Sequence, residues 1–175
     1  MPNPLWSNVA ALFRPRSPLG DVLRKLPIFA RLNRAQLREL EHIVHERTYR
    51  AGEVVFTMGD AGVALYVILA GEVRIVLPAH ETGSEVELAR LGSGDLFGEL
   101  ALVDSAPRSA TAVAATPTEV AAVARPDWLD LIRRHPDAGV EMLLPLAELL
   151  AARLRAANRI HVEKTHGVAV EEQPT

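Results

Sequence analysis

The chain has 175 residues, of which 49% are hydrophobic and 23% are charged, and its formal net charge is -3. These values are typical of one globular domain, and they exclude a disordered chain and a nucleic-acid binder that relies on overall positive charge. The absence of cysteine excludes disulfide frameworks and thiolate metal sites. Because no stretch resembles a secretory signal or is long enough to span a bilayer, we expect a cytoplasmic protein without a transmembrane segment.

The charge is unevenly distributed along the chain. Residues 1–50 carry nine Arg or Lys residues against four Asp or Glu residues, whereas residues 51–125 carry four against ten. The basic first segment has two interpretations, a contact with an acidic partner or membrane surface and a solvated helix face. We favour the solvated face, and we expect no nucleic-acid partner because the whole chain lacks a basic balance.

The first part of the chain is predicted to be helical. Residues 1–25 are expected to form an N-terminal arm and a short helix that ends near Pro27. A second helix is predicted from Asn33, a suitable N-cap that is followed three residues later by Gln36, which is the spacing of a capping box. Its apolar positions form one stripe: Leu32, Leu37, Leu40, Ile43 and Val44.

Short β-rich runs punctuated by glycine follow the second helix. Gly71, in "AGEVRI", separates two apolar runs and predicts a hairpin. The run "EVELARL" alternates with period two, so we expect one of its faces to be buried. Strands continue after Ser109 in "SATAVAA" and "TEVAAVA". Many short strands with turn glycines predict a barrel or a double-sheet roll.

Two helices are predicted to complete the domain. Pro126 opens the first, "PDWLDLIRRH", and Pro136 opens a longer one in which Pro145 introduces a bend. Residues 161–175 are predicted to be a polar tail.

The segment "FGELALVDSAPRSATAVAA" carries the chemistry of the chain. Gly98 allows close backbone approach or a positive φ, and the helix formers after it leave amide groups at a helix start, which favours phosphate. Arg108 adds a guanidinium that pairs well with a phosphate monoanion or diester. A carboxylate such as Glu99 would repel phosphate, but it accepts a hydrogen bond from a sugar hydroxyl. Together these residues predict a nucleotide held by its ribose and phosphate. The alternative, a surface salt bridge beside a turn glycine, would be preferred if "GEL" stood alone.

This segment resembles the phosphate-binding cassette of the cyclic nucleotide-binding domain family, through "GDLFGELAL" and "PRSATAVAA". Further similarity lies in "LPIFARLNRAQLRELEHIV" and "YRAGEVVFTMGDAGVALYVILAGEVRI". The resemblance implies a domain over residues 26–160. It also implies an α+β fold, an eight-stranded antiparallel β-roll of the jelly-roll or cupin-like barrel type. N-terminal helices and two C-terminal helices, called B and C, would flank the roll.

The resemblance also assigns roles to residues of the cassette. Glu99 is similar to the acid that binds the ribose 2′-hydroxyl, and Arg108 to the arginine that pairs with the exocyclic phosphate oxygens. Three residues resemble the turn whose backbone approaches ribose and phosphate: Gly98, Leu100 and Ala101.

Ser109 occupies the position after the arginine, where the backbone and hydroxyl can contact phosphate or purine, and Ala110 continues the floor of the cassette. A serine at this position favours cyclic AMP over cyclic GMP, although its hydroxyl can also reach guanine. We expect Phe97 to belong to the core, and Val86 and Leu88 either to line the base pocket or to belong to the core.

The sequence departs from the family pattern at one position, and for one role in the pattern it offers two candidate residues. Val63 stands where the family usually has an aspartate that supports a turn rather than the ligand. The family covers the base with a residue of the last helix, for which Arg153 and Arg155 are candidates and a solvated helix face is the alternative.

The resemblance implies a sensor or regulatory module that binds a cyclic nucleotide, with cyclic AMP favoured. No output domain is evident, so the module is expected to act on an unidentified protein partner in trans. The alternative is a scaffold subunit that binds no nucleotide or another one, cyclic GMP or cyclic di-GMP. Because no histidine has a metal-ligand spacing and no catalytic triad is recognisable, we expect no enzymatic activity and no metal.

The last helix leaves two interpretations open. In related proteins this helix forms a dimer seam, and the same residues could equally pack on the roll of their own chain. The residues with three-four spacing are Leu143, Leu146, Leu150, Leu154 and Ala157.

Overall fold

The computed structural model describes residues 19–78 and 85–168, and the expected arm at residues 1–18 lies outside them. In this part of the chain, two helices come first, α2 (Leu19–Lys25) and α3 (Arg34–His42), and two come last, α5 (Arg125–Arg134) and α6 (Pro136–Val168). Between them lie eight strands and the short helix α4 (Leu100–Val103). The strands are β1 (Val44–Tyr49), β2 (Val54–Phe56), β3 (Ala64–Ala70), β4 (Val73–Pro78), β5 (Glu85–Leu91), β6 (Leu96–Phe97), β7 (Thr111–Ala114) and β8 (Thr118–Ala124).

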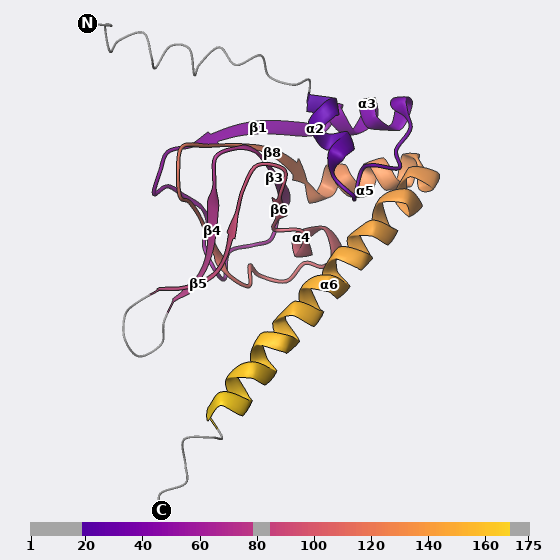
Figure 1. Ribbon diagram of the computed structural model, residues 1–175. Coiled ribbons are helices and arrows are strands. Elements are labelled where there is room, and N and C mark those ends of the chain that lie inside the picture. The colour runs from indigo at the N-terminus through magenta and orange to yellow at the C-terminus, as the bar shows by residue number, and fades with distance from the viewer. Residues whose placement is uncertain (1–18, 79–84, 169–175) are drawn as a thin grey trace, which may run out of the picture.

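The strands form two antiparallel four-stranded sheets that face each other as a roll (Figure 1). The first sheet has the order β1-β8-β3-β6 and the second β2-β7-β4-β5. The α+β roll with eight strands and flanking helices is therefore confirmed. In the described part of the chain, no ladder of hydrogen bonds joins the two sheets, so the roll is not a closed barrel.

The predicted hairpin at Gly71 is wrong, because β3 and β4 belong to different sheets. Gly71 has φ +90° and lies in a corner that carries the chain from one sheet to the other. A second crossing, between β7 and β8, lies against it, where Ala115 N–H donates to the Glu72 carbonyl at 2.8 Å and the Thr118 hydroxyl donates to it at 3.0 Å. The corner lets the apolar runs on both sides of Gly71 contribute to opposite walls of one core.

The strand β5 is also less buried than its alternation predicts. It lies at the edge of its sheet, and only its last part is shielded from solvent. Val86 is 47% exposed and Leu88 is 53% exposed. Leu91, at the end of β5, packs against the core, so the buried face predicted by the period-two pattern is confined to the end of the strand.

The N-terminal and C-terminal helices pack together at one end of the roll (Figure 1). The capping box of α3 is confirmed, since Asn33 Oδ1 accepts from Gln36 N–H at 3.0 Å and Gln36 Oε1 accepts from Asn33 N–H at 2.9 Å. Trp128 of α5 is fully buried in the shared core, with its ring centroid 6.4 Å from that of Phe29. Burial of each such side chain contributes roughly 1.5–3 kcal/mol, so this core anchors α5 and the start of α6.

Helix α6 has a buried and an exposed side. It runs from Pro136 through Pro145 to Val168, past the expected domain boundary at residue 160, and its far end extends beyond the roll (Figure 1). Its predicted leucine stripe is divided: Leu146 is buried in the core of its own chain and Leu150 is half-buried against it. An exposed apolar stripe remains on the helix, at Val140, Leu143, Leu144 and Leu154.

Candidate functional site

The segment between β6 and β7 forms a tight loop around one short helix. Gly98, directly after β6, has φ +71°, which glycine adopts without strain. A β-carbon at this position would lie 2.7 Å from Arg108 Nη1 and 3.2 Å from the Ala64 carbonyl oxygen. The Ala101 amide donates back to the Gly98 carbonyl at 3.2 Å and so closes the first turn. Glycine is required here because two other parts of the site lie against its backbone.

Arg108 is a buried cation inside this loop. The residue is 6% exposed, and its Nη2 donates to the Ala64 carbonyl at 2.9 Å while its Nη1 donates to the Gly98 carbonyl at 3.2 Å. Its Nε has no hydrogen-bond partner. Burial lowers the pKa of the guanidinium, and Tyr66 and Glu99 partly oppose that change. An arginine with unused donors in a dry site attracts an anion strongly.

Glu99 is a buried carboxylate in the same loop. The residue is 5% exposed, and its Oε1 forms an ion pair with Arg153 Nη1 of α6 at 2.6 Å. Its Oε2 is buried without a partner. Because an unpaired buried carboxylate oxygen is costly, this atom is suited to a ligand donor such as a hydroxyl.

A cavity of about 440 Å³ contains both groups, within the range of roughly 300–1,000 Å³ that is usual for small-ligand sites. Six of the seven predicted site residues line it: Gly98, Glu99, Leu100, Ala101, Arg108 and Ser109. The seventh, Ala110, is buried but does not line the cavity. Leu88 lines it and Val86 does not.

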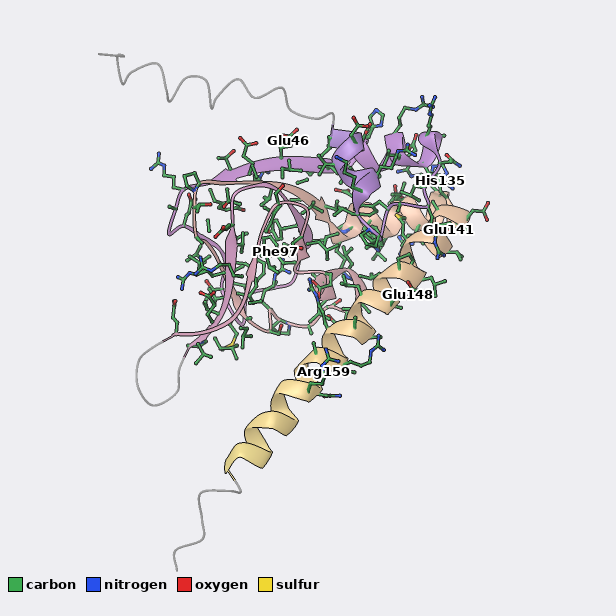
Figure 2. The ribbon with its side chains drawn as sticks, in the orientation of Figure 1. Glu46, Phe97, His135, Glu141, Glu148 and Arg159 are labelled. Atoms are coloured by element: carbon green, nitrogen blue, oxygen red, sulfur yellow. The ribbon has the colours of Figure 1, made fainter. Side chains whose placement is uncertain are left out.

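Several lining residues were not found from the sequence. Phe97, expected only in the core, is 2% exposed, lies inside the roll (Figure 2) and also lines the cavity. The others come from distant strands and from α6, and they include Phe56, Ile75, Leu91, Ala156 and Ala157. Of these, only the α6 residues could have been found from the sequence. Ala156 and Ala157 follow Arg153 by three and four residues and therefore lie on the same face of the helix.

Of the two candidates for the residue that covers the base, Arg153 lines the cavity and Arg155 does not. Besides its ion pair with Glu99, Arg153 donates from Nη2 to the Leu96 carbonyl at 2.7 Å. The helix α6 thus contacts the loop through one polar side chain. Glu148 and Arg159, labelled in Figure 2, show the course of α6 on either side of this contact.

Together, the two-sheet roll, the buried cation and the partly unpaired carboxylate form a cavity that suits a small anionic ligand carrying hydroxyl groups. The chain belongs to the cyclic nucleotide-binding domain family, whose model, described as "Cyclic nucleotide-binding domain", matches residues 46–135. Members of this family are regulatory, nucleotide-binding domains, which agrees with the resemblance carried by the cassette.

Individual relatives agree with this assignment. A protein of Thermus thermophilus described as a cyclic AMP receptor protein is 47% identical over 112 residues, which cover 64% of this chain and 50% of the relative. The chain therefore spans about half the length of that relative.

Solved structures are similar as well. The Thermus thermophilus catabolite activator protein has a TM-score of 0.69 at 40% identity, covering 79% of this chain and 63% of that one. The regulatory domain of Toxoplasma gondii protein kinase A, solved with cyclic AMP, has a TM-score of 0.60 at 28% identity, covering 65% of this chain and 42% of that one.

Residues 19–78 and 85–168 also bear on membrane association and metal binding. Within these ranges no helix is both long and apolar enough to cross a membrane. The same residues contain no group of three or more His, Asp or Glu side chains that could hold a metal ion.

Proposed function

We propose that this chain is a cyclic nucleotide sensor whose domain spans residues 26–160, with cyclic AMP as its favoured ligand. The observation that carries the proposal is that Arg108 and Glu99 line the same cavity. Both residues are more than nine-tenths buried, and each has a polar atom without a hydrogen-bond partner. A cyclic nucleotide supplies a phosphodiester monoanion for the first and a ribose 2′-hydroxyl for the second. Names of the relatives in Thermus thermophilus and Toxoplasma gondii support cyclic AMP.

In the proposed complex, Arg108 donates to the exocyclic phosphate oxygens and Glu99 Oε2 accepts from the 2′-hydroxyl. Because Arg153 already neutralises Glu99, the carboxylate can face the ribose without repelling the phosphate. The remaining cassette residues would contact the ligand or support the loop that contacts it. Gly98, Leu100 and Ala101 form the turn around the ribose phosphate, Ser109 contacts phosphate or purine, and Ala110 supports the loop from below.

The base would rest against an apolar wall. Ile75, Leu88 and Leu91 line the cavity on the sheet side, and Ala156 and Ala157 line it on the α6 side. Partial closure by α6 would shield the base from water. Ligand bound at Glu99 would change the surroundings of Arg153, so α6 would report occupancy to a partner protein. A ligand can shift α6 only to the extent that it binds the two helix positions differently.

Isothermal titration of the full chain with cyclic AMP and with cyclic GMP tests the proposal. We expect saturable binding, tighter for cyclic AMP because Ser109 follows the arginine. Replacement of Arg108 by alanine should weaken binding by roughly 2–4 kcal/mol through lost charge-assisted hydrogen bonds. Arg90→Ala, at an exposed arginine paired with Glu87, is the matched control and should bind as the parent does. No heat and no thermal shift at millimolar nucleotide would refute the proposal.

The exposed stripe of α6 supports a second candidate function, an interaction subunit that associates with a second copy of the chain. Val140, Leu143, Leu144 and Leu154 place large apolar groups in solvent along one helix, and such surfaces mark interaction sites. Sedimentation velocity should show a dimer that Leu154→Glu converts to a monomer, whereas Arg155→Glu should leave it intact. A monomeric parent, or a Leu154→Glu variant that remains dimeric, would contradict this role.

Association that is indifferent to cyclic AMP would favour the interaction subunit over the sensor. A dimer whose dissociation constant changes with cyclic AMP would support the sensor, because binding and association would then be thermodynamically linked.

A further inference from the structure

Three aromatic side chains meet beneath the loop that carries the site. Phe56 comes from β2 in one sheet, and Tyr66 and Phe97 come from β3 and β6 in the other. The ring centroids of Tyr66 and Phe97 lie 5.2 Å apart with nearly parallel planes, and those of Phe56 lie 5.8 Å from Tyr66 and 5.9 Å from Phe97. The three rings therefore form one cluster that bridges the two sheets.

Arg108 lies directly on this cluster. Its Cζ is 4.0 Å from the ring centroid of Phe56 and 5.7 Å from that of Tyr66. Both distances are within the reach of a cation–π interaction. The Gly98 carbonyl accepts a hydrogen bond from Arg108 Nη1, and the Ala64 carbonyl accepts one from Nη2. The ring face supports the guanidinium on one side, and the two hydrogen bonds restrict its rotation.

The cation–π contact should be strong at this position. Arg108 is 6% exposed, so little water competes for its charge, and a desolvated cation gains the most from an aromatic face. A guanidinium held on a ring face and by two carbonyls keeps its unused N–H donors, Nε–H among them, in fixed directions. Phe56 lines the cavity as well, so its ring lies where the ligand would bind.

We propose that Phe56 is a positioning residue, whose ring holds the Arg108 guanidinium in the one orientation that distinguishes the two exocyclic oxygens of a bound phosphodiester. The inference rests on the proposed function. The two oxygens differ in their direction from the ribose, and a guanidinium with a fixed plane pairs properly with only one of them. A guanidinium free to tilt would follow whichever oxygen is available, and the distinction would be lost.

The two phosphorothioate diastereomers of cyclic AMP are the probes, since in each a sulfur atom replaces one exocyclic oxygen and accepts hydrogen bonds poorly. The parent chain should bind one diastereomer about tenfold more tightly than the other. Phe56→Leu should weaken cyclic AMP binding about tenfold and reduce the ratio between diastereomers below about threefold. Phe56→Tyr keeps the ring face and should restore both values.

Phe29→Leu is the matched control, because it removes a fully buried ring that lies outside this cluster, against Trp128, and does not line the cavity; it should keep the ratio of the parent. If Phe56→Leu does not fold, as judged by its thermal transition, Phe56→Met keeps the volume without the ring and should show the same loss. A Phe56→Leu or Phe56→Met variant that keeps the parent ratio would overturn the inference. A Phe29→Leu variant that loses it equally would do the same.

The proposed function and this inference fail in different ways. A parent chain that binds cyclic AMP but not one diastereomer over the other overturns the positioning role and leaves the sensor standing. A parent chain that does not bind cyclic AMP overturns both.

Discussion

The ion pair between Glu99 and Arg153 predicts how firmly α6 is held to the roll before any ligand binds. We consider Arg153→Ala. The change removes the ion pair to Glu99 Oε1 at 2.6 Å and the hydrogen bond to the Leu96 carbonyl at 2.7 Å. It leaves a carboxylate that is 5% exposed without any partner on either oxygen.

The magnitude follows from the different exposure of the two partners. Removal of one member of a fully buried ion pair costs about 3–5 kcal/mol, whereas an exposed pair is worth about 0–1 kcal/mol. The Arg153 side chain is 39% exposed and that of Glu99 is 6% exposed, so the pair lies between these limits. We expect the free energy of unfolding to fall by about 1–2 kcal/mol, which corresponds to about 3–6 °C in Tm for a chain of this length.

Urea unfolding of the ligand-free chain measures this effect. Arg155→Ala, two residues along the same helix and exposed, is the control and should change stability by less than about 0.5 kcal/mol. Glu99→Gln combined with Arg153→Ala should recover most of the loss, because the double variant leaves no buried carboxylate without a partner. A double-mutant cycle should therefore give a coupling energy of about 1–2 kcal/mol.

Two results would refute this reasoning. Arg153→Ala and Arg155→Ala could be equally stable, which would mean that the ion pair contributes nothing. The coupling energy could also fall within about 0.3–0.5 kcal/mol of zero, the range of independent sites. In either case α6 would be held by its apolar contacts alone.

Three further outcomes are expected. Gly71→Ala should destabilise the chain by more than about 3 kcal/mol, because a β-carbon would overlap the facing turn in addition to the strain of a positive φ; Gly94→Ala, with φ +91° and open space, should cost only about 1 kcal/mol in the same urea unfolding. Asn33→Ala should cost about 1 kcal/mol through the lost cap, whereas Asn33→Ser should be nearly neutral. Gly98→Ala should weaken cyclic AMP binding in a titration by displacing Arg108, with a smaller change in stability than at Gly71.

Much of the local structure follows from the sequence. The cap of α3 depends on Asn33 and Gln36, which are three residues apart, and the strands of the roll are short runs between glycines. The core of the candidate site was also accessible, since Glu99 and Arg108 lie in one segment of the chain. Interactions over so few residues are set by backbone geometry and residue type, which sequence patterns report directly.

Other features could be decided only by the tertiary structure. The sequence around Gly71 suits a hairpin and a corner equally well, and the choice depends on whether the two apolar runs bury more surface within one sheet or in two. The lining of the cavity brings together Phe56, Ile75 and Ala156, which are far apart in the chain.

The sequence by itself thus determined the family, the helices and strands, and the charged pair that would hold a ribose phosphate. Only the tertiary structure decided that Arg153 pairs with Glu99 while Arg155 stays in solvent, and that an aromatic ring lies under Arg108. The physical reason is that local patterns specify which groups are present, whereas the packing of distant elements specifies which groups meet.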